Sequence, residues 1–183
     1  MQMSVYSTIL SLGVLSIFTL TVITIFGFIF SKNVREILEK IPYFTYLKII
    51  GSIAILSTTF AMIYQLYFEL DVCILCWWQR IFIFPIDIVI LVSLWKKIRG
   101  NHVITWILAF IGLFFASYHY YYHFMWHVMG YAVSMPCEVG WLLPACTSHE
   151  WVLIFWFITI PFMSVCVLFA MTWLSFLASK SRK

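Results

Sequence analysis

Long stretches without a charged residue dominate this chain of 183 residues. Residues 1–31 contain no Asp, Glu, Lys or Arg, and neither do residues 49–68 or 100–137. Hydrophobic residues make up 64% of the sequence and charged residues 10%, against about 45–50% and about 25% in soluble domains. One soluble core of this length cannot bury so much apolar surface, so the sequence predicts an integral membrane protein.

Five segments are long and apolar enough to cross a bilayer as helices. A helix rises about 1.5 Å per residue, so about 20 apolar residues span a hydrocarbon core of about 30 Å. The third segment begins near Cys76 and therefore contains Arg80 one turn inside it. We predict an all-α, polytopic membrane helical bundle with spans at about residues 9–30, 49–68, 76–96, 103–124 and 151–177.

Ten of the eleven Lys and Arg residues fall on one side of this bundle. Five alternating spans put residues 31–48, 96–102 and the C-terminal tail on one face, and the N-terminus, residues 69–76 and residues 125–150 on the other. The positive-inside rule makes the first face cytoplasmic, so we predict an outside N-terminus and a cytoplasmic C-terminus. The net charge of +4 thus reflects orientation, and we expect no nucleic-acid partner. Arg80, the exception, is a functional candidate.

Residues 31–48, between the first two spans, carry an amphipathic pattern. Apolar Val34, Ile37, Leu38 and Ile41 alternate with charged residues at helical spacing. An amphipathic helix lying along the inner membrane surface is one interpretation, and a plain solvated loop is the other.

Four of the five cysteines, Cys73, Cys76, Cys137 and Cys146, map to the predicted outer face. In a bacterial cell this is the compartment where disulfides form and persist. Cys73 and Cys76 form a C-x-x-C motif at a helix start, a spacing used by redox disulfides and by half of a zinc site. A zinc site through all four thiols and two structural disulfides are the alternatives. Cys166 is expected to be a small apolar core residue.

The surroundings of Cys76 favour a redox role. A thiol at a helix N-terminus meets the positive end of the macrodipole, and Arg80 lies four residues on, on the same helical face. Both effects favour thiolate over thiol. Because a structural disulfide needs no thiolate stabiliser, the sequence favours a reactive pair.

The run from Cys73 to Arg80, CILCWWQR, resembles the C-x-L-C-x-x-[EQ]-R signature of the disulfide bond formation protein B (DsbB) family. Its WWQRI portion most resembles the BdbC branch of that family, as do SYHY at residues 117–120 and FITIP at residues 157–161. The resemblance covers about residues 47–178.

This resemblance implies a four-helix bundle in the bacterial cytoplasmic (inner) membrane. Such a protein takes electrons from a soluble thioredoxin-fold, DsbA-like dithiol oxidase and passes them to the membrane quinone pool, either ubiquinone or menaquinone, with no metal. Carried over by position, the candidate residues are the quinone-coupled pair Cys73 and Cys76, the partner-exchanging pair Cys137 and Cys146, and, at the quinone, Arg80 with its neighbour Gln79.

The implied domain organisation has three parts. Residues 47–178 form the four-helix core, residues 179–183 form a basic cytoplasmic tail, and residues 1–46 hold an extra N-terminal transmembrane helix with its amphipathic connection. The extra helix departs from the four-helix pattern.

His119, His123 and His127 recur every four residues near the outer end of the fourth span. Such a stripe can bind haem or a metal, can pack at the membrane interface, or can hydrogen-bond a quinone through His119 or His123. A non-enzymatic haem or metal-binding membrane subunit is therefore one alternative. A vitamin K epoxide reductase-like enzyme is another, but there the C-x-x-C motif comes after the second cysteine pair, the reverse of the order here.

Three further residues interrupt the apolar spans. Asp87 lies inside the third span, and the sequence indicates no partner for it. Pro85 is expected to kink the same helix, and Pro161 the last one.

Overall fold

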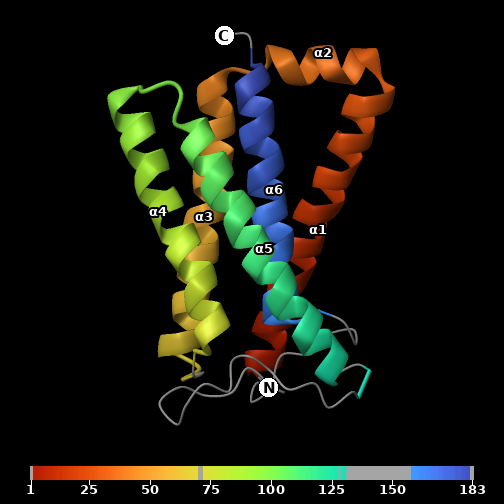
Figure 1. Ribbon diagram of the computed structural model, residues 1–183, viewed down its shortest axis with the longest axis vertical. Helices are drawn as coiled ribbons and strands as arrows, with labels where there is room; N and C mark the ends of the chain where they lie inside the picture. Colours follow the sequence, from red (N-terminus) through yellow and green to blue (C-terminus); the bar gives the residue numbers. More distant parts are fainter. Residues whose placement is uncertain (1, 70–71, 128, 131–157, 182–183) are drawn as a thin grey trace.

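The computed structural model describes residues 2–69, 72–127, 129–130 and 158–181 (Figure 1). Five of the helices in this part of the chain are long and apolar enough to cross a membrane, and α2 is the short exception. The predicted all-α polytopic bundle is confirmed. In chain order the helices are α1 (Gln2–Phe30), α2 (Lys32–Lys40), α3 (Tyr43–Leu66), α4 (Ile74–Lys96), α5 (His102–His127) and α6 (Ile160–Lys180).

Helix α6 lies at the centre of the bundle. It packs against α1, α3 and α5, whereas α4 packs against α3 and α5 on the other side (Figure 1). Within the apolar 18-residue stretch of each helix, half of the residues of α6 are buried inside the protein, compared with 17% of those of α1. Helix α1 is therefore an edge helix, and many of its side chains face away from the rest of the bundle.

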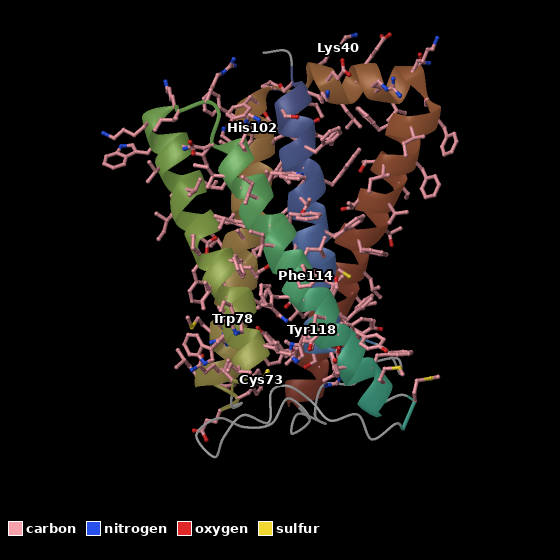
Figure 2. All side chains as sticks on the ribbon, viewed as in Figure 1. Lys40, Cys73, Trp78, His102, Phe114 and Tyr118 are labelled. Atoms are coloured by element: carbon pink, nitrogen blue, oxygen red, sulfur yellow. The ribbon has the colours of Figure 1, made fainter. Side chains whose placement is uncertain are left out.

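The two ends of the bundle differ in chemistry. Helix α2, the last residues of α4 and α6, and the C-terminus share one end, which we call the basic end (Figure 1). The N-terminus and the start of α4 lie at the other, which we call the cysteine end. Figure 2 shows Lys40 at the basic end and Cys73 at the cysteine end.

Residues 32–40 form an amphipathic helix, so the loop interpretation of this segment is wrong. Ser31 caps α2, because its hydroxyl accepts a hydrogen bond from the backbone N–H of Val34 at 3.4 Å. The Tyr46 hydroxyl of α3 donates to the Leu38 carbonyl at 2.7 Å. Gly27 allows α1 to approach α2 closely, since a Cβ atom there would lie 2.9 Å from Val34.

The last span begins later than the sequence suggested. Helix α6 starts at Ile160, and the Thr159 hydroxyl accepts a hydrogen bond from the Phe162 N–H at 3.4 Å. Pro161 lies in the first turn, where its missing N–H leaves no intrahelical bond unmade. The predicted kink at Pro161 is therefore wrong, whereas Pro85 does lie inside α4. Residues 151–157 lie outside the described part.

Asp87 has a partner that the sequence did not indicate. The Thr58 hydroxyl donates to Asp87 Oδ2 at 2.7 Å and so joins α3 to α4 inside the bundle. Cys166 is fully buried among apolar side chains of α6 and its neighbours, as predicted for a small core residue.

Candidate functional site

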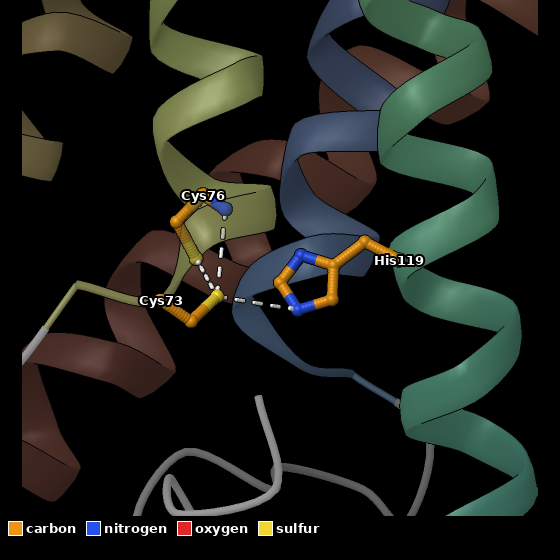
Figure 3. Close-up of side chains that lie close together, drawn as sticks. All are labelled: Cys73, Cys76 and His119. Carbon is orange, nitrogen blue, oxygen red and sulfur yellow. Dashed lines mark hydrogen bonds between the residues drawn. The ribbon is translucent and has the colours of Figure 1, made fainter. Parts of the chain in front are cut away.

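Cys73 and Cys76 lie at the first turn of α4. Cys73 is the N-cap residue, and its Sγ atom accepts a hydrogen bond from the backbone N–H of Cys76 at 3.4 Å. The two Sγ atoms are 3.0 Å apart (Figure 3). Cys73 is 1% exposed, and Cys76 is partly buried. The pair is thus a closely spaced dithiol at the positive end of a helix.

Both thiols lie in the first turn of α4, as predicted for Cys76, but Cys73 is the one that occupies the N-cap position. The sequence interpretation put Cys76 at the helix N-terminus, but the N-cap position and the N–H bond belong to Cys73. The hydrogen bond with Cys76, followed by the hydrogen bond and charge of His119, lowers the pKa of Cys73 to about 4, although burial opposes the shift. The N-cap bond and the nearby His119 therefore favour a thiolate at Cys73.

His119 projects from α5 toward this thiolate. Its Nε2 atom lies 3.7 Å from Cys73 Sγ (Figure 3), and its Nδ1 atom lies 3.0 Å from Gln79 Nε2. His119 and Gln79 are both buried. The Gln79 amide at Nδ1 turns the Nε2 side of the ring toward the sulfur. Gln79 thus orients a histidine that stabilises negative charge on Cys73.

The other two histidines of the stripe lie further along α5. His123 is buried one turn away, with its ring centroid 6.4 Å from that of His119, and His127 is the last residue of the helix. The ligand atoms of Cys73, Cys76 and His119 all lie within 4.8 Å of one another, close enough to hold a metal ion. This cluster differs from the four-cysteine zinc site considered from the sequence, because a histidine joins the first thiol pair.

Arg80 is held by α3. Its side chain is 9% exposed and donates hydrogen bonds to the Gln65 side-chain oxygen and, at 3.3 Å, to the Ala61 carbonyl. The guanidinium carbon also lies 5.4 Å from the centre of the Trp77 ring. Sequence reasoning missed Gln65. Its signal was an amide in an otherwise apolar span, close to the same end of the bundle as Arg80.

A cavity of about 420 Å³ opens beside Cys76. Apolar side chains of α1, α3, α4 and α6 form most of its wall, and its polar lining at the cysteine end comes from Cys76, Gln79, Arg80, Gln65 and Tyr64. Among the described site residues, Cys73, His119 and His123 do not line it. The cavity therefore brings together two of the four predicted cofactor-binding residues, Arg80 and Gln79, with one thiol of the pair.

The second cysteine pair, Cys137 and Cys146, lies outside the described residues. The predicted partner-exchanging role of these two thiols therefore remains a prediction.

The sequence model of the family described as "Disulfide bond formation protein DsbB" matches residues 44–178 of this chain. Among individual proteins, the chain is 35% identical over 111 residues to the SPbeta prophage-derived disulfide bond formation protein B of Bacillus subtilis (strain 168). That match covers 60% of this chain and 70% of the relative. This chain is also 29% identical over 125 residues to a probable disulfide formation protein of Coxiella burnetii (strain Dugway 5J108-111). The second match covers 68% of this chain and 81% of the relative.

No solved structure matches the chain significantly. The family match covers most of the sequence and includes α4, which carries the dithiol, together with α5 and α6. It begins after α1 and α2. The chain therefore belongs to the DsbB family of disulfide bond formation proteins, as a multi-pass membrane member.

Proposed function

We propose that this protein is a membrane thiol oxidase that reoxidises a soluble, thioredoxin-fold, DsbA-like dithiol oxidase and passes the electrons to a membrane quinone. One observation carries the proposal: Cys76 of the Cys73–Cys76 dithiol lines the polar end of an apolar cavity that is also lined by the buried Arg80. A metal-free electron relay needs this combination, because thiols must meet a lipid-soluble acceptor.

The residues of the cavity fit a quinone. A volume of about 420 Å³ is within the range of about 300–1,000 Å³ common for small-molecule sites. A quinone has polar carbonyl oxygens on a ring and an apolar isoprenoid tail, and the cavity has the matching polarity. Arg80 donates bonds to Gln65 and Ala61, and a guanidinium has five N–H donors, so donors remain for a carbonyl oxygen. Arg80 and Gln79 would hold the ring.

The electrons would travel by two thiol–disulfide exchanges. A thiolate of the reduced partner attacks the Cys137–Cys146 disulfide at Cys137 and releases Cys146. The partner's second thiol then displaces Cys137, and the partner leaves as a disulfide. Cys146, released as a thiolate, attacks the Cys73–Cys76 disulfide at Cys73, which frees Cys76. Closure of the Cys137–Cys146 disulfide then leaves Cys73 and Cys76 as the dithiol.

When bound, the quinone supplies the two-electron acceptor and takes up two protons as the Cys73–Cys76 disulfide re-forms. The protein contributes position and charge. Arg80 stabilises negative charge at the cavity, and Gln79 holds His119 against Cys73. In this proposal His119 assists the thiolate rather than the quinone oxygen, because it contacts Cys73 and does not line the cavity.

We further propose that the protein lies in the bacterial cytoplasmic membrane with its cysteine end outside. Basic residues gather at the opposite end of the bundle: they lie on α2, at the end of α4 and at Lys180. This distribution supports the orientation under the positive-inside rule. Disulfide exchange with exported proteins requires the cysteine end to face the oxidising compartment.

Anaerobic mixing tests the proposal. Purified protein is mixed with a reduced thioredoxin-fold oxidase and a quinone, and the quinone absorbance is followed. We expect stoichiometric loss of the quinone absorption with matching oxidation of the partner. A protein that leaves the quinone unchanged while its thiols are fully reduced is not a quinone-dependent oxidase. A Soret band in the purified protein would instead support the haem-binding alternative.

A further inference from the structure

Helix α1 forms one side of the cavity beside Cys76. The α1 residues that line it recur at helical spacing along one face of the helix: Tyr6, Ile9, Leu10, Gly13, Val14 and Ile17. The opposite wall comes from α3, α4 and α6. Without α1, this side of the space beside Arg80 would face the surroundings of the bundle.

Specific contacts hold α1 in this position. Near the cysteine end, the Tyr64 hydroxyl of α3 donates to Ser7 Oγ at 2.9 Å, and the Tyr6 ring packs edge-on against Tyr64 at 5.3 Å. Toward the basic end, the Trp173 indole N–H of α6 donates to Thr24 Oγ1 at 3.1 Å. Helix α1 is thus held at the cysteine end of the cavity, where Tyr6 and Tyr64 also line it, and again farther along toward the basic end.

Gly13 lies on the cavity-lining face of α1. A Cβ atom built at Gly13 would meet no other atom within 4 Å, although the residue lines the cavity. A glycine inside a helix costs stability, about 0.5–1 kcal/mol relative to alanine. The absence of a side chain here leaves room in the cavity for an apolar group of a ligand.

The polarity of the cavity lining changes along its length. Gln65, Cys76 and Arg80 lie toward the cysteine end, whereas Ile17 of α1 and Val167 of α6 line the cavity closer to the middle of the bundle. Ser57 of α3 also lines the middle part, but its hydroxyl donates to the Ile53 carbonyl of its own helix. A ligand with a polar ring and an apolar tail therefore fits in one orientation, with its ring at Arg80 and its tail along α1 and α6.

We propose that α1 is a wall of the electron-acceptor site and that its Gly13 face selects quinones that carry an isoprenoid tail. This inference rests on the proposed quinone function and adds a role for a helix outside the region matched by the family model. Helix α1 turns a surface groove into a lined channel, so the tail gains contacts that the four-helix core alone does not supply.

The test fills the cavity from α1. In Gly13→Phe the new ring occupies space that the tail would use, and Gly13→Ala is the graded variant. Leu12→Phe is the matched control, because Leu12 is the neighbouring residue, is 53% exposed and does not line the cavity. Dissociation constants for a short-chain ubiquinone and for its tail-less ring analogue are measured by quenching of tryptophan fluorescence. Melting temperature checks the fold.

We expect Gly13→Phe to weaken binding of the tailed quinone about tenfold or more, with a smaller effect on the tail-less ring. Leu12→Phe should bind both as the unaltered protein does. Equal affinities of Gly13→Phe and the unaltered protein for the tailed quinone would overturn the role of α1 while leaving the quinone function standing. If the unaltered protein itself binds neither quinone, the proposed function fails instead. If Gly13→Phe does not fold, Gly13→Leu takes its place with the same expected order of affinities.

Discussion

The Nε2 atom of His119 lies 3.7 Å from the Sγ atom of Cys73, although 46 residues of sequence separate them. Gln79, on the next turn of α4 after Cys76, contacts the other nitrogen of the ring at 3.0 Å. A thiolate at a helix N-cap, a histidine and an amide therefore form one chain of contacts. These contacts stabilise negative charge on Cys73.

Replacing His119 with alanine should raise the pKa of Cys73. The pKa in the unaltered protein is about 4, so the thiolate is present above that pH and is lost as pH falls through it. Without the ring, the loss should occur about one pH unit higher. The thiolate ultraviolet absorbance is titrated in the reduced form of a protein in which Cys137, Cys146 and Cys166 are replaced.

The control for this titration is His102→Ala, which removes a histidine at the far end of the same helix. Its midpoint should equal that of the parent. An unchanged midpoint in His119→Ala would mean that the bond from Cys76 alone sets the pKa of Cys73.

Arg80→Lys should impair the quinone step and spare the exchange with the partner. A compact ammonium cannot reproduce the planar donor geometry that reaches Gln65, Ala61 and the cavity together. We expect the apparent KM for quinone to rise about tenfold or turnover to fall by a similar factor. One stoichiometric round of partner oxidation, run without quinone, should stay near that of the unaltered protein. Failure of that round with unchanged quinone affinity would assign Arg80 to the disulfide relay or to the fold.

Gln65→Leu should resemble a weaker form of Arg80→Lys. Loss of the amide oxygen leaves a buried guanidinium donor unpaired, which costs about 1–3 kcal/mol, and allows the side chain to move. The quinone KM should rise, and Gln65→Glu should restore it because a carboxylate still accepts the bond. A double-mutant cycle with Arg80→Lys measures the coupling. Strictly additive effects would show that Gln65 does not act through Arg80.

Cys146→Ala should accumulate a covalent complex with the partner oxidase through Cys137. With Cys146 absent, the Cys137 thiolate attacks the disulfide of the oxidised partner, and the mixed disulfide persists because no second thiol of the pair can resolve it. The complex runs as a larger species on a non-reducing gel. Removal of Cys137 in the same assay should abolish the complex. A complex that forms through Cys146 when Cys137 is absent would exchange the roles of the two thiols.

A phosphatase reporter that is active only outside the cytoplasm should be inactive when fused after Lys183. The reason is the gathering of basic residues at the end of the bundle that holds α2 and the C-terminus. A second fusion, between α3 and α4 after Glu69, should be active. The reverse pattern would place the cysteine end in the cytoplasm and overturn the proposed function in exported protein oxidation.

The transmembrane spans could be predicted because each depends on its own residues. Lipid requires the backbone hydrogen bonds of a span to close within one helix, so hydropathy and length suffice to find the first four spans. The first two begin at Val5 and Tyr43, earlier than the predicted residues 9 and 49. The start of α6 was harder to predict. Apolar residues precede Ile160 without a break, and the capping hydroxyl of Thr159, a local and chemically weak signal, marks the boundary that the structure has.

The dithiol also belongs to what the sequence by itself determined. A C-x-x-C motif at a helix start brings two thiols together through local geometry, and an arginine four residues later lies on the same face. The sequence did not determine which of the two thiols caps the helix. The capping thiol depends on whether the first helical residue is Ile74 or a later one, and the sequence interpretation began the helix two residues too late.

Only the tertiary structure decided which helices meet and at what depth. In lipid, apolar side chains give no preference for one neighbouring helix over another, so hydropathy carries no information on packing partners. The contacts of His119 with Cys73, of Gln65 with Arg80 and of Thr58 with Asp87 each join two helices. The position of Gly13 on the cavity wall is a further case, because it follows from how α1 packs on α6 and α3. These contacts depend on side-chain fit and interhelical hydrogen bonds, which exist only once the bundle has formed.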